Sequence, residues 1–328
     1  MQPTNPQAPD GLLSLIQQAK ENYREPPPVR KRGRPRTYTG RSFLLLAVVA
    51  VSVRTFKPTE LHRWLECDAK LCEALGFSTV PHRKTIERRL DSLLPEAEAQ
   101  VAILGQHLKD HVTASRTSAQ VSAIDGRMYQ AQGPKWHQKD RQRGVIPLGL
   151  RNVDTESAWF KSGYRGWVQG YRLLVQGLVF PVPVPLWATW QPNNRGEATI
   201  MAHALAHHQM PITDVLLGDT TFGSDDLTRA YARAGGWLLT PTQLPKQRRC
   251  WKHDLYAYRR ETIELLFQRI IQASDLKACP SKGLARNGAF VMTSVWLYQL
   301  IVLSNSRQRR PVAHVKDQLD LARWRITI

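Results

Sequence analysis

From residue 121 onward the chain alternates between short apolar runs and amphipathic stretches, and this order restricts the folds that it can adopt. Apolar runs bounded by Gly or Pro are typical of strands, and apolar residues that recur every three or four positions are typical of helices. The sequence predicts strands at 121–129, 171–180 and 185–191, a helix at 197–208, a strand at 215–219, a helix at 224–235, a strand at 237–240 and a helix at 254–274. We therefore expect an α/β domain with a mixed sheet flanked by helices.

Two of the short strand-like runs end in an aspartate. Asp125 follows the run 121–124, and the next residue, Gly126, permits close approach by a bulky group. Asp219 ends the run 215–219 and is followed by residues typical of a turn and a helix cap. A single aspartate at a strand end is more often a helix cap or a turn former, so neither position is diagnostic alone.

A third carboxylate, Glu264, lies on the last predicted helix, one turn after Arg260. Taken alone, this pair predicts only a surface ion pair. The order of three strands, helix, strand, helix, strand, helix is, however, that of an RNase-H-like domain, in which the first and fourth strands are neighbours. We therefore expect Asp125 and Asp219 to lie side by side, with Glu264 brought over them by the last helix. Such a set of oxygen ligands can hold a pair of divalent cations.

The charge of the chain is strongly unbalanced. It has 46 Lys and Arg against 27 Asp and Glu, which gives a net charge of +19 and a pI of about 10.2. This excess predicts a polyanionic partner, with nucleic acid as the first candidate.

Nothing in the sequence indicates a membrane or secretory protein. The longest apolar runs, 43–53 and 289–303, are shorter than the roughly 20 residues that span a bilayer, so we expect core helices and no membrane partner. The first ten residues are polar and contain no hydrophobic signal region. The four cysteines lack zinc-like spacing, which indicates reduced thiols in a cytoplasmic protein.

The region before residue 119 predicts DNA contacts. Residues 1–40 are expected to form a flexible basic arm, whose Arg-Gly-Arg-Pro core resembles an AT-hook for the minor groove; a solvated basic linker is the alternative. Residues 41–118 are expected to form a helical DNA-binding domain. Its basic stretch 82–90 is typical of a helix-turn-helix recognition helix, although such charged faces are often only solvated.

Three segments carry a resemblance to a known family. They are Ala-Ile-Asp-Gly-Arg, Leu-Leu-Gly-Asp-Thr-Thr-Phe-Gly-Ser-Asp-Asp-Leu and Tyr-Arg-Arg-Glu-Thr-Ile-Glu-Leu-Leu-Phe. They resemble the catalytic segments of the DDE transposases of bacterial insertion sequences, within the group that has a Tyr-Arg-Glu-Lys signature. The resemblance covers residues 119–305 as an RNase-H-like catalytic domain, followed by a basic C-terminal tail at 306–328.

The resemblance implies a function and a site. The function is cleavage of double-stranded DNA at the terminal inverted repeats of an element and strand transfer into target DNA. Asp125, Asp219 and Glu264 would be the catalytic residues and would bind Mg²⁺ (or Mn²⁺), two ions per site. A homodimer on paired DNA ends, in the bacterial cytoplasm and associated with the nucleoid, is also implied.

Two positions depart from the signature. The tyrosine should fall at Ala257, which Tyr256 and Tyr258 flank, and the lysine should fall at Ile271. The substitution at Ile271 supports one alternative, a catalytically decayed or repurposed sequence-specific DNA-binding protein. A metal-dependent nuclease without strand transfer is a further alternative.

The residues expected to contact DNA are basic or aromatic, and they come from the arm, the recognition helix and the segment around the start of the last helix. They are Arg32, Arg34, Arg36, Arg83, Lys84, Arg88, Arg89, Lys246, Arg248, Arg249, Lys252, Tyr258 and Arg260.

Overall fold

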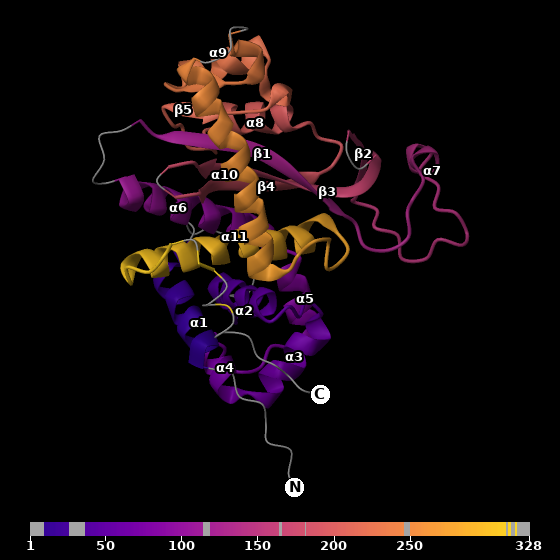
Figure 1. The fold of residues 1–328 in the computed structure, drawn as a ribbon. Helices are drawn as coiled ribbons and strands as arrows, with labels where there is room; N and C mark the ends of the chain where they lie inside the picture. Colours follow the sequence, from indigo (N-terminus) through magenta and orange to yellow (C-terminus); the bar gives the residue numbers. More distant parts are fainter. Residues whose placement is uncertain are drawn as a thin grey trace. The chain divides into compact units, whose positions relative to one another are not determined.

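The computed structural model describes residues 10–25, 37–113, 119–163, 166–180, 182–245, 250–312, 314–315 and 319 (Figure 1). Its contacts divide the chain into two compact units. The helical unit comprises Met1–Leu104, Ile270–Leu276 and Ala285–Ile328, and the sheet unit comprises Gly105–Arg269 and Lys277–Leu284. Each unit is described by itself below, and the domain limits expected from the sequence stay predictions.

The helical unit is built around two strongly apolar helices. Helix α2 (Gly40–Ser52) begins where the Thr39 side chain accepts a hydrogen bond from the Ser42 backbone N–H, and Phe43 to Ser52 are all buried. Helix α11 (Leu284–Arg307) is, among the described residues, the one helix long and apolar enough to cross a membrane, and its most apolar window is entirely buried within the protein. The other helices are α1 (Asp10–Asn22), α3 (Pro58–Cys67), α4 (Ala69–Ala74), α5 (Arg83–Leu90) and the first part of α6 (Leu94–Thr113).

The sheet unit contains a six-stranded mixed sheet. Its main strands run in the order β4-β3-β1-β5-β6, with β3 antiparallel to both β1 and β4, and with β5 and β6 parallel to β1. This is the strand order of an RNase-H-like domain, so the expected α/β fold is confirmed. The strands are β1 (Val121–Gln130), β2 (Ala158–Ser162), β3 (Gly166–Leu178), β4 (Val184–Pro192), β5 (Val215–Leu217) and β6 (Trp237–Leu239).

Two elements were not expected from the sequence. Helix α7 (Gln138–Gln142) and strand β2 lie between β1 and β3, and β3 begins five residues earlier than its apolar run predicts, at Gly166 rather than Tyr171. Strand β2 pairs with this early part of β3, from Gly166 to Gly170. Because β2 is short and half-exposed, its pairing partner rather than its composition decides its conformation.

Helices cover both faces of the sheet. On one face, α8 (Glu197–Ala206) and α9 (Asp225–Arg233) pack on an apolar cluster that includes Ile124 and Leu174. On the other face lies the first part of α10 (Trp251–Ser274), where a Cβ at Gly177 would come within 2.5 Å of the Leu266 side chain. Side chains alternate between faces along a strand, so Ile124 and Gly126 face α8, whereas Asp125 faces α10.

Candidate metal centre

Asp125 and Asp219 lie at the point where β1 and β5 separate. The two strands pair in parallel as far as Ala123 and Leu217, and each aspartate lies two residues beyond that last pair. Beyond Ala123, β1 remains paired with β3. Asp219 then caps a short 3-10 turn, where its Oδ1 accepts a hydrogen bond of 2.8 Å from the Thr221 backbone N–H. Asp125 thus lies within β1, not at a strand end as the sequence predicted, because β3 keeps pairing with β1 up to Gln130. The sheet still brings Asp125 and Asp219 together, as the topology predicts.

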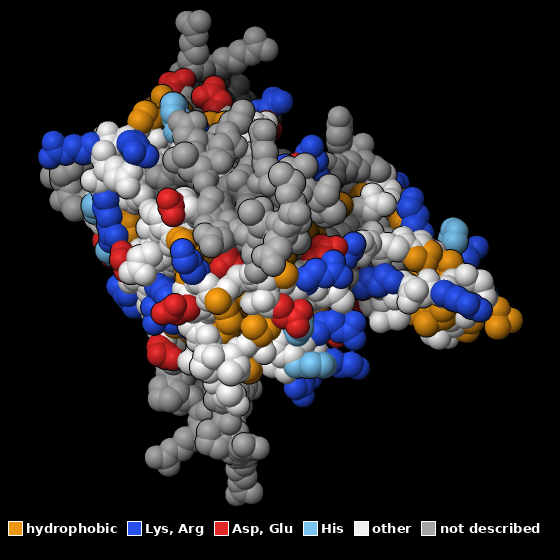
Figure 2. Space-filling view, turned by 90° about the horizontal axis from the view of Figure 1, so that it is seen from below, with side chains coloured by type: hydrophobic (Ala, Val, Ile, Leu, Met, Phe, Trp, Pro, Cys, Tyr) orange, Lys and Arg blue, Asp and Glu red, His pale blue; other side chains and the backbone are white. Residues whose placement is uncertain are grey.

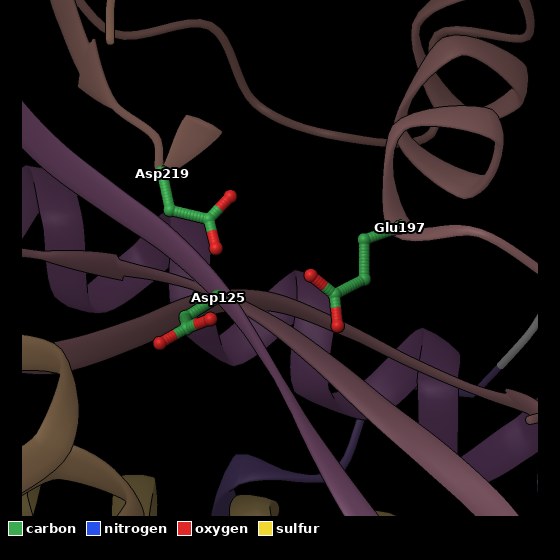
Figure 3. A group of neighbouring side chains, drawn as sticks. All are labelled: Asp125, Glu197 and Asp219. Atoms are coloured by element: carbon green, nitrogen blue, oxygen red, sulfur yellow. The ribbon is translucent and has the colours of Figure 1, made fainter. Parts of the chain in front are cut away.

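The third carboxylate at this point is Glu197, the first residue of α8. One ligand oxygen each from Asp125, Glu197 and Asp219 lie within 4.8 Å of one another. Figure 3 shows the carboxylates of Asp219 and Glu197 directed toward each other, with Asp125 on β1 beside them. Glu197 reaches this position over Gly126, where a Cβ would lie 2.2 Å from the Glu197 Oε1 atom. The bulky group that Gly126 admits is thus a carboxylate of the site itself.

Two arginines pair with members of this carboxylate cluster. Arg172, on β3, places Nε 3.3 Å from Glu197 Oε1, and its side chain is 2% exposed. Arg259, on α10, places Nη2 3.2 Å from Asp125 Oδ2, and its side chain is 13% exposed. Among the described residues, Asp219 has no such ion pair.

Burial controls the protonation of the cluster. It raises the pKa of Glu197 to about 7: the Arg172 guanidinium lowers this pKa without cancelling the effect, and Asp125 and Asp219 raise it further. Burial also raises the pKa of Asp125; Arg259 and the Gly126 backbone N–H oppose the rise, and the carboxylates of Asp219 and Glu264 add to it. Half-buried carboxylates that repel one another and retain oxygen donors fit a divalent cation, which prefers such ligands and would relieve that repulsion.

Glu264 is not one of the three converging carboxylates. It pairs with Arg260 at 3.4 Å on the outward side of α10, where the Glu264 side chain is 60% exposed and that of Arg260 is 83% exposed. Its negative charge still raises the pKa of Asp125, so it lies within electrostatic range of the cluster. A metal-binding role for Glu264 stays a prediction.

The recognition-helix residues lie on α5. Arg83, Lys84 and Arg88 are exposed there, as the prediction of a DNA-contacting face requires. Arg89 packs over the Phe43 ring, with 5.1 Å between its Cζ and the ring centroid, and donates a hydrogen bond to the Tyr38 carbonyl. Arg89 therefore holds the N-terminal end of α2, and DNA contact by all four residues stays a prediction.

The residues expected to bind DNA around the start of α10 are partly engaged with neighbouring aromatic side chains. Lys252 lies over the Trp237 and Trp251 rings, at 5.4 and 5.9 Å from the ring centroids. Tyr258 contacts Phe180 edge to face at 4.8 Å. Figure 2 shows that Lys and Arg side chains are more widespread than Asp and Glu on the face that it draws. The remaining DNA-contact predictions lie outside the described residues; they are Arg32, Arg34, Arg36, Lys246, Arg248 and Arg249.

The sequence analysis missed Glu197, and its local signal is weak. An acidic residue in the first turn of a helix is favoured by the helix dipole wherever it occurs, so the position carries no mark of a site. The usable signal is the combination of Gly126 beside Asp125 with a glutamate that opens the helix after the third main strand. That combination points to a site only once the tertiary structure shows that the start of α8 packs over Gly126 of β1.

No family model and no curated protein sequence matches the chain. Among solved structures, it is similar to the piggyBac transposase synaptic complex with hairpin DNA, with a TM-score of 0.45 and 10% identity, over 95% of this chain and 77% of that one. It is similar to the Mos1 transposase paired-end complex with the left transposon end, with a TM-score of 0.22 and 10% identity, over 83% of this chain and 81% of that one. A pre-cleavage Mos1 transpososome gives a TM-score of 0.21 and 9% identity over the same shares. At these scores the fold assignment rests on the strand order described above.

Proposed function

We propose that this chain is a metal-dependent transposase that cleaves DNA strands and transfers them to a target. The observation that carries the proposal is the convergence of Asp125, Glu197 and Asp219 where the parallel strands of an RNase-H-like sheet separate. The net charge of +19 supports a polyanionic substrate.

The chain's own residues would divide the work as follows. Asp125, Glu197 and Asp219 would supply the oxygen ligands for divalent cations. Bound in such a site, divalent cations promote attack on a phosphodiester by activating the nucleophile and stabilising the leaving oxygen. Arg172 would hold the Glu197 carboxylate in place from below the start of α8. Exposed basic side chains would neutralise the phosphates that flank the scissile bond.

The finer features belong to the same proposal. The gene would belong to a bacterial insertion sequence, and the protein would bind two Mg²⁺ or Mn²⁺ ions per site. It would cut DNA at terminal inverted repeats and act as a homodimer on paired DNA ends. Ala257 and Ile271, in place of the signature tyrosine and lysine, set this chain apart from the group that it resembles. Activity despite these departures would mean that other side chains supply the DNA contacts.

The test is cleavage of labelled DNA that carries the sequences flanking the gene, in Mg²⁺ or Mn²⁺. We expect Asp125→Asn, Glu197→Gln and Asp219→Asn each to reduce cleavage by more than about 100-fold, because even removal of an outer partner of a metal ligand costs 10–100-fold. Glu264→Gln tests the third ligand that the resemblance implies, a carboxylate of α10 outside the cluster. Equal loss of cleavage in Glu264→Gln would make Glu264 a ligand as well, and full cleavage by the three cluster variants would refute the proposal.

A second candidate is a repurposed DNA-binding protein without catalysis. Two ion pairs favour it, Arg172–Glu197 and Arg259–Asp125. They offset much of the negative charge of the cluster without a metal, as a purely structural network would. It predicts DNA binding that weakens with salt, no Mn²⁺ binding and no cleavage by the wild type. Cleavage without joined products would instead indicate a nuclease.

A further inference from the structure

We propose that Arg259 has two alternative partners: Asp125 while the cluster is free of metal, and a DNA phosphate once a divalent cation is bound. This inference rests on the proposed function, because it assumes that the carboxylate cluster binds a cation. It assigns to Arg259 a positioning role that links metal binding to DNA binding.

The first step is the position of the guanidinium. Arg259 lies on the side of α10 that faces the sheet, one turn before the buried Ile263, and its Nη2 atom lies 3.2 Å from Asp125 Oδ2. Asp125 is one of the three converging carboxylates, so Arg259 holds a positive charge where a divalent cation would need the same ligand. A guanidinium and a divalent cation repel each other, so they compete for the negative charge of Asp125.

The second step is that Arg259 is loosely anchored. Its Nε atom is buried without a hydrogen-bond partner among the described residues. Its charge also lowers the pKa of Tyr256, one turn earlier on the same helix, and that of Glu197. A buried donor without an acceptor is costly, so a partner that accepts more of its hydrogen bonds would be preferred.

Arg172 provides the contrast. Its Nε and Nη2 atoms also lack a full hydrogen bond, but its Nη1 donates to the Arg195 carbonyl at 3.0 Å and its Cζ lies 4.4 Å from the centroid of the Phe160 ring. These contacts hold Arg172 within β3 and its surroundings whatever happens to Glu197. Of the two arginines in the cluster, Arg259 is therefore the one free to change partner.

The third step is where Arg259 would go. Arginine presents a planar set of donors that matches a phosphate, and a phosphate held by the metal cluster would lie beside Asp125. Moving from Asp125 to that phosphate would satisfy the unpaired donor and would vacate the metal ligand. Metal and DNA would then each promote binding of the other, as thermodynamic linkage requires.

The test uses the full chain and two measurements, both independent of activity. The first is calorimetric titration with Mn²⁺ at pH 8, for wild type, Arg259→Gln, Arg259→Lys and the matched control Arg260→Gln. Arg260 is the adjacent, exposed arginine, so its variant makes the same change of charge outside the cluster. We expect Arg259→Gln to bind Mn²⁺ about tenfold more tightly, a gain of about 1.4 kcal/mol, and the other two variants to bind as the wild type does.

The second measurement is binding of a labelled random-sequence DNA duplex, with Ca²⁺ or with a chelator present. Ca²⁺ takes the same kind of oxygen ligands. We expect Arg259→Gln to weaken binding about tenfold in Ca²⁺ and to leave it unchanged in the chelator, whereas Arg260→Gln has the same effect in both. Opposite effects of one substitution on metal and on DNA are the signature of an arginine that exchanges partners.

Each failure has its own meaning. If Arg259→Gln folds normally and binds Mn²⁺ no more tightly than the wild type, Arg259 is a structural ion-pair partner and the inference is wrong. Tighter Mn²⁺ binding without weaker DNA binding would likewise overturn the exchange of partners. If neither the wild type nor any variant binds Mn²⁺, the proposed function itself fails.

Discussion

Two adjacent arginines of α10 each pair with a carboxylate, and the two pairs have opposite settings. Arg259 faces the sheet and meets Asp125, with side-chain exposures of 13% and 24%, whereas Arg260 faces outward and meets Glu264 at 83% and 60%. An exposed pair of this kind contributes little to stability and is screened by salt. The inward pair, by contrast, lies against a cluster whose pKa values are shifted by burial. Adjacent positions on α10 thus differ in setting: one side chain faces the carboxylate cluster and the next faces solvent.

The largest effect should come from the apolar residues that fix this rotation. Leu266 is fully buried against Gly177, and its neighbour Leu265 is 37% exposed. We expect Leu266→Ala to lower the free energy of unfolding by about 2–5 kcal/mol, because it leaves a cavity under the helix. Leu265→Ala should change it by less than about 0.5 kcal/mol. Urea unfolding of both variants checks this, and similar losses would mean that α10 does not pack as described.

The next effect is a pH dependence of the free energy of unfolding that comes from Glu197. Its pKa is about 7 in the folded protein, above the ordinary value of 4.5, so the folded state binds this proton more tightly than the unfolded state does. Stability attributable to this carboxyl is present below pH 4.5 and is lost as pH rises through 7. Wild type should therefore lose up to about 3 kcal/mol relative to Glu197→Gln across that range, in the absence of metal. A constant difference in unfolding free energy between the two proteins from pH 4.5 to 8 would show that Glu197 is not buried in this way.

The close contact over β1 gives a smaller effect. Gly126→Ala would place a Cβ 2.2 Å from Glu197 Oε1, so the Glu197 carboxylate must move from its position beside Arg172. We expect a loss of about 1–3 kcal/mol in unfolding free energy, together with weaker Mn²⁺ binding. Gly149→Ala is the control, because nothing lies within 4 Å of a Cβ there. Unchanged Mn²⁺ affinity in Gly126→Ala would separate Glu197 from the metal ligands.

The smallest effect should come from the outward pair. Arg260→Gln and Glu264→Gln are each expected to change the unfolding free energy by less than about 0.5 kcal/mol. The double variant should show no coupling beyond that range, measured by thermal unfolding at low and high salt. A coupling of several kcal/mol would mean that the outward pair is not the exposed ion pair described here.

The sequence by itself determined the fold and two members of the cluster. The order of apolar runs and amphipathic stretches is that of an RNase-H-like domain, in which the first and fourth main strands are neighbours, and Asp125 and Asp219 directly follow the apolar runs of those strands. Their proximity follows from the period of a strand and the order of the sheet, both of which can be read along the chain.

Only the tertiary structure decided which glutamate joins them and which arginine faces them. Arg259 and Arg260 both precede the buried Ile263 by about one turn, so the apolar period alone permits either to point inward. Glu197 lies at a helix start, a position that favours acidic residues everywhere, and its approach depends on how α8 packs over Gly126. These choices depend on the rotation and placement of helices against the sheet, which side-chain packing between distant segments sets and no local pattern encodes.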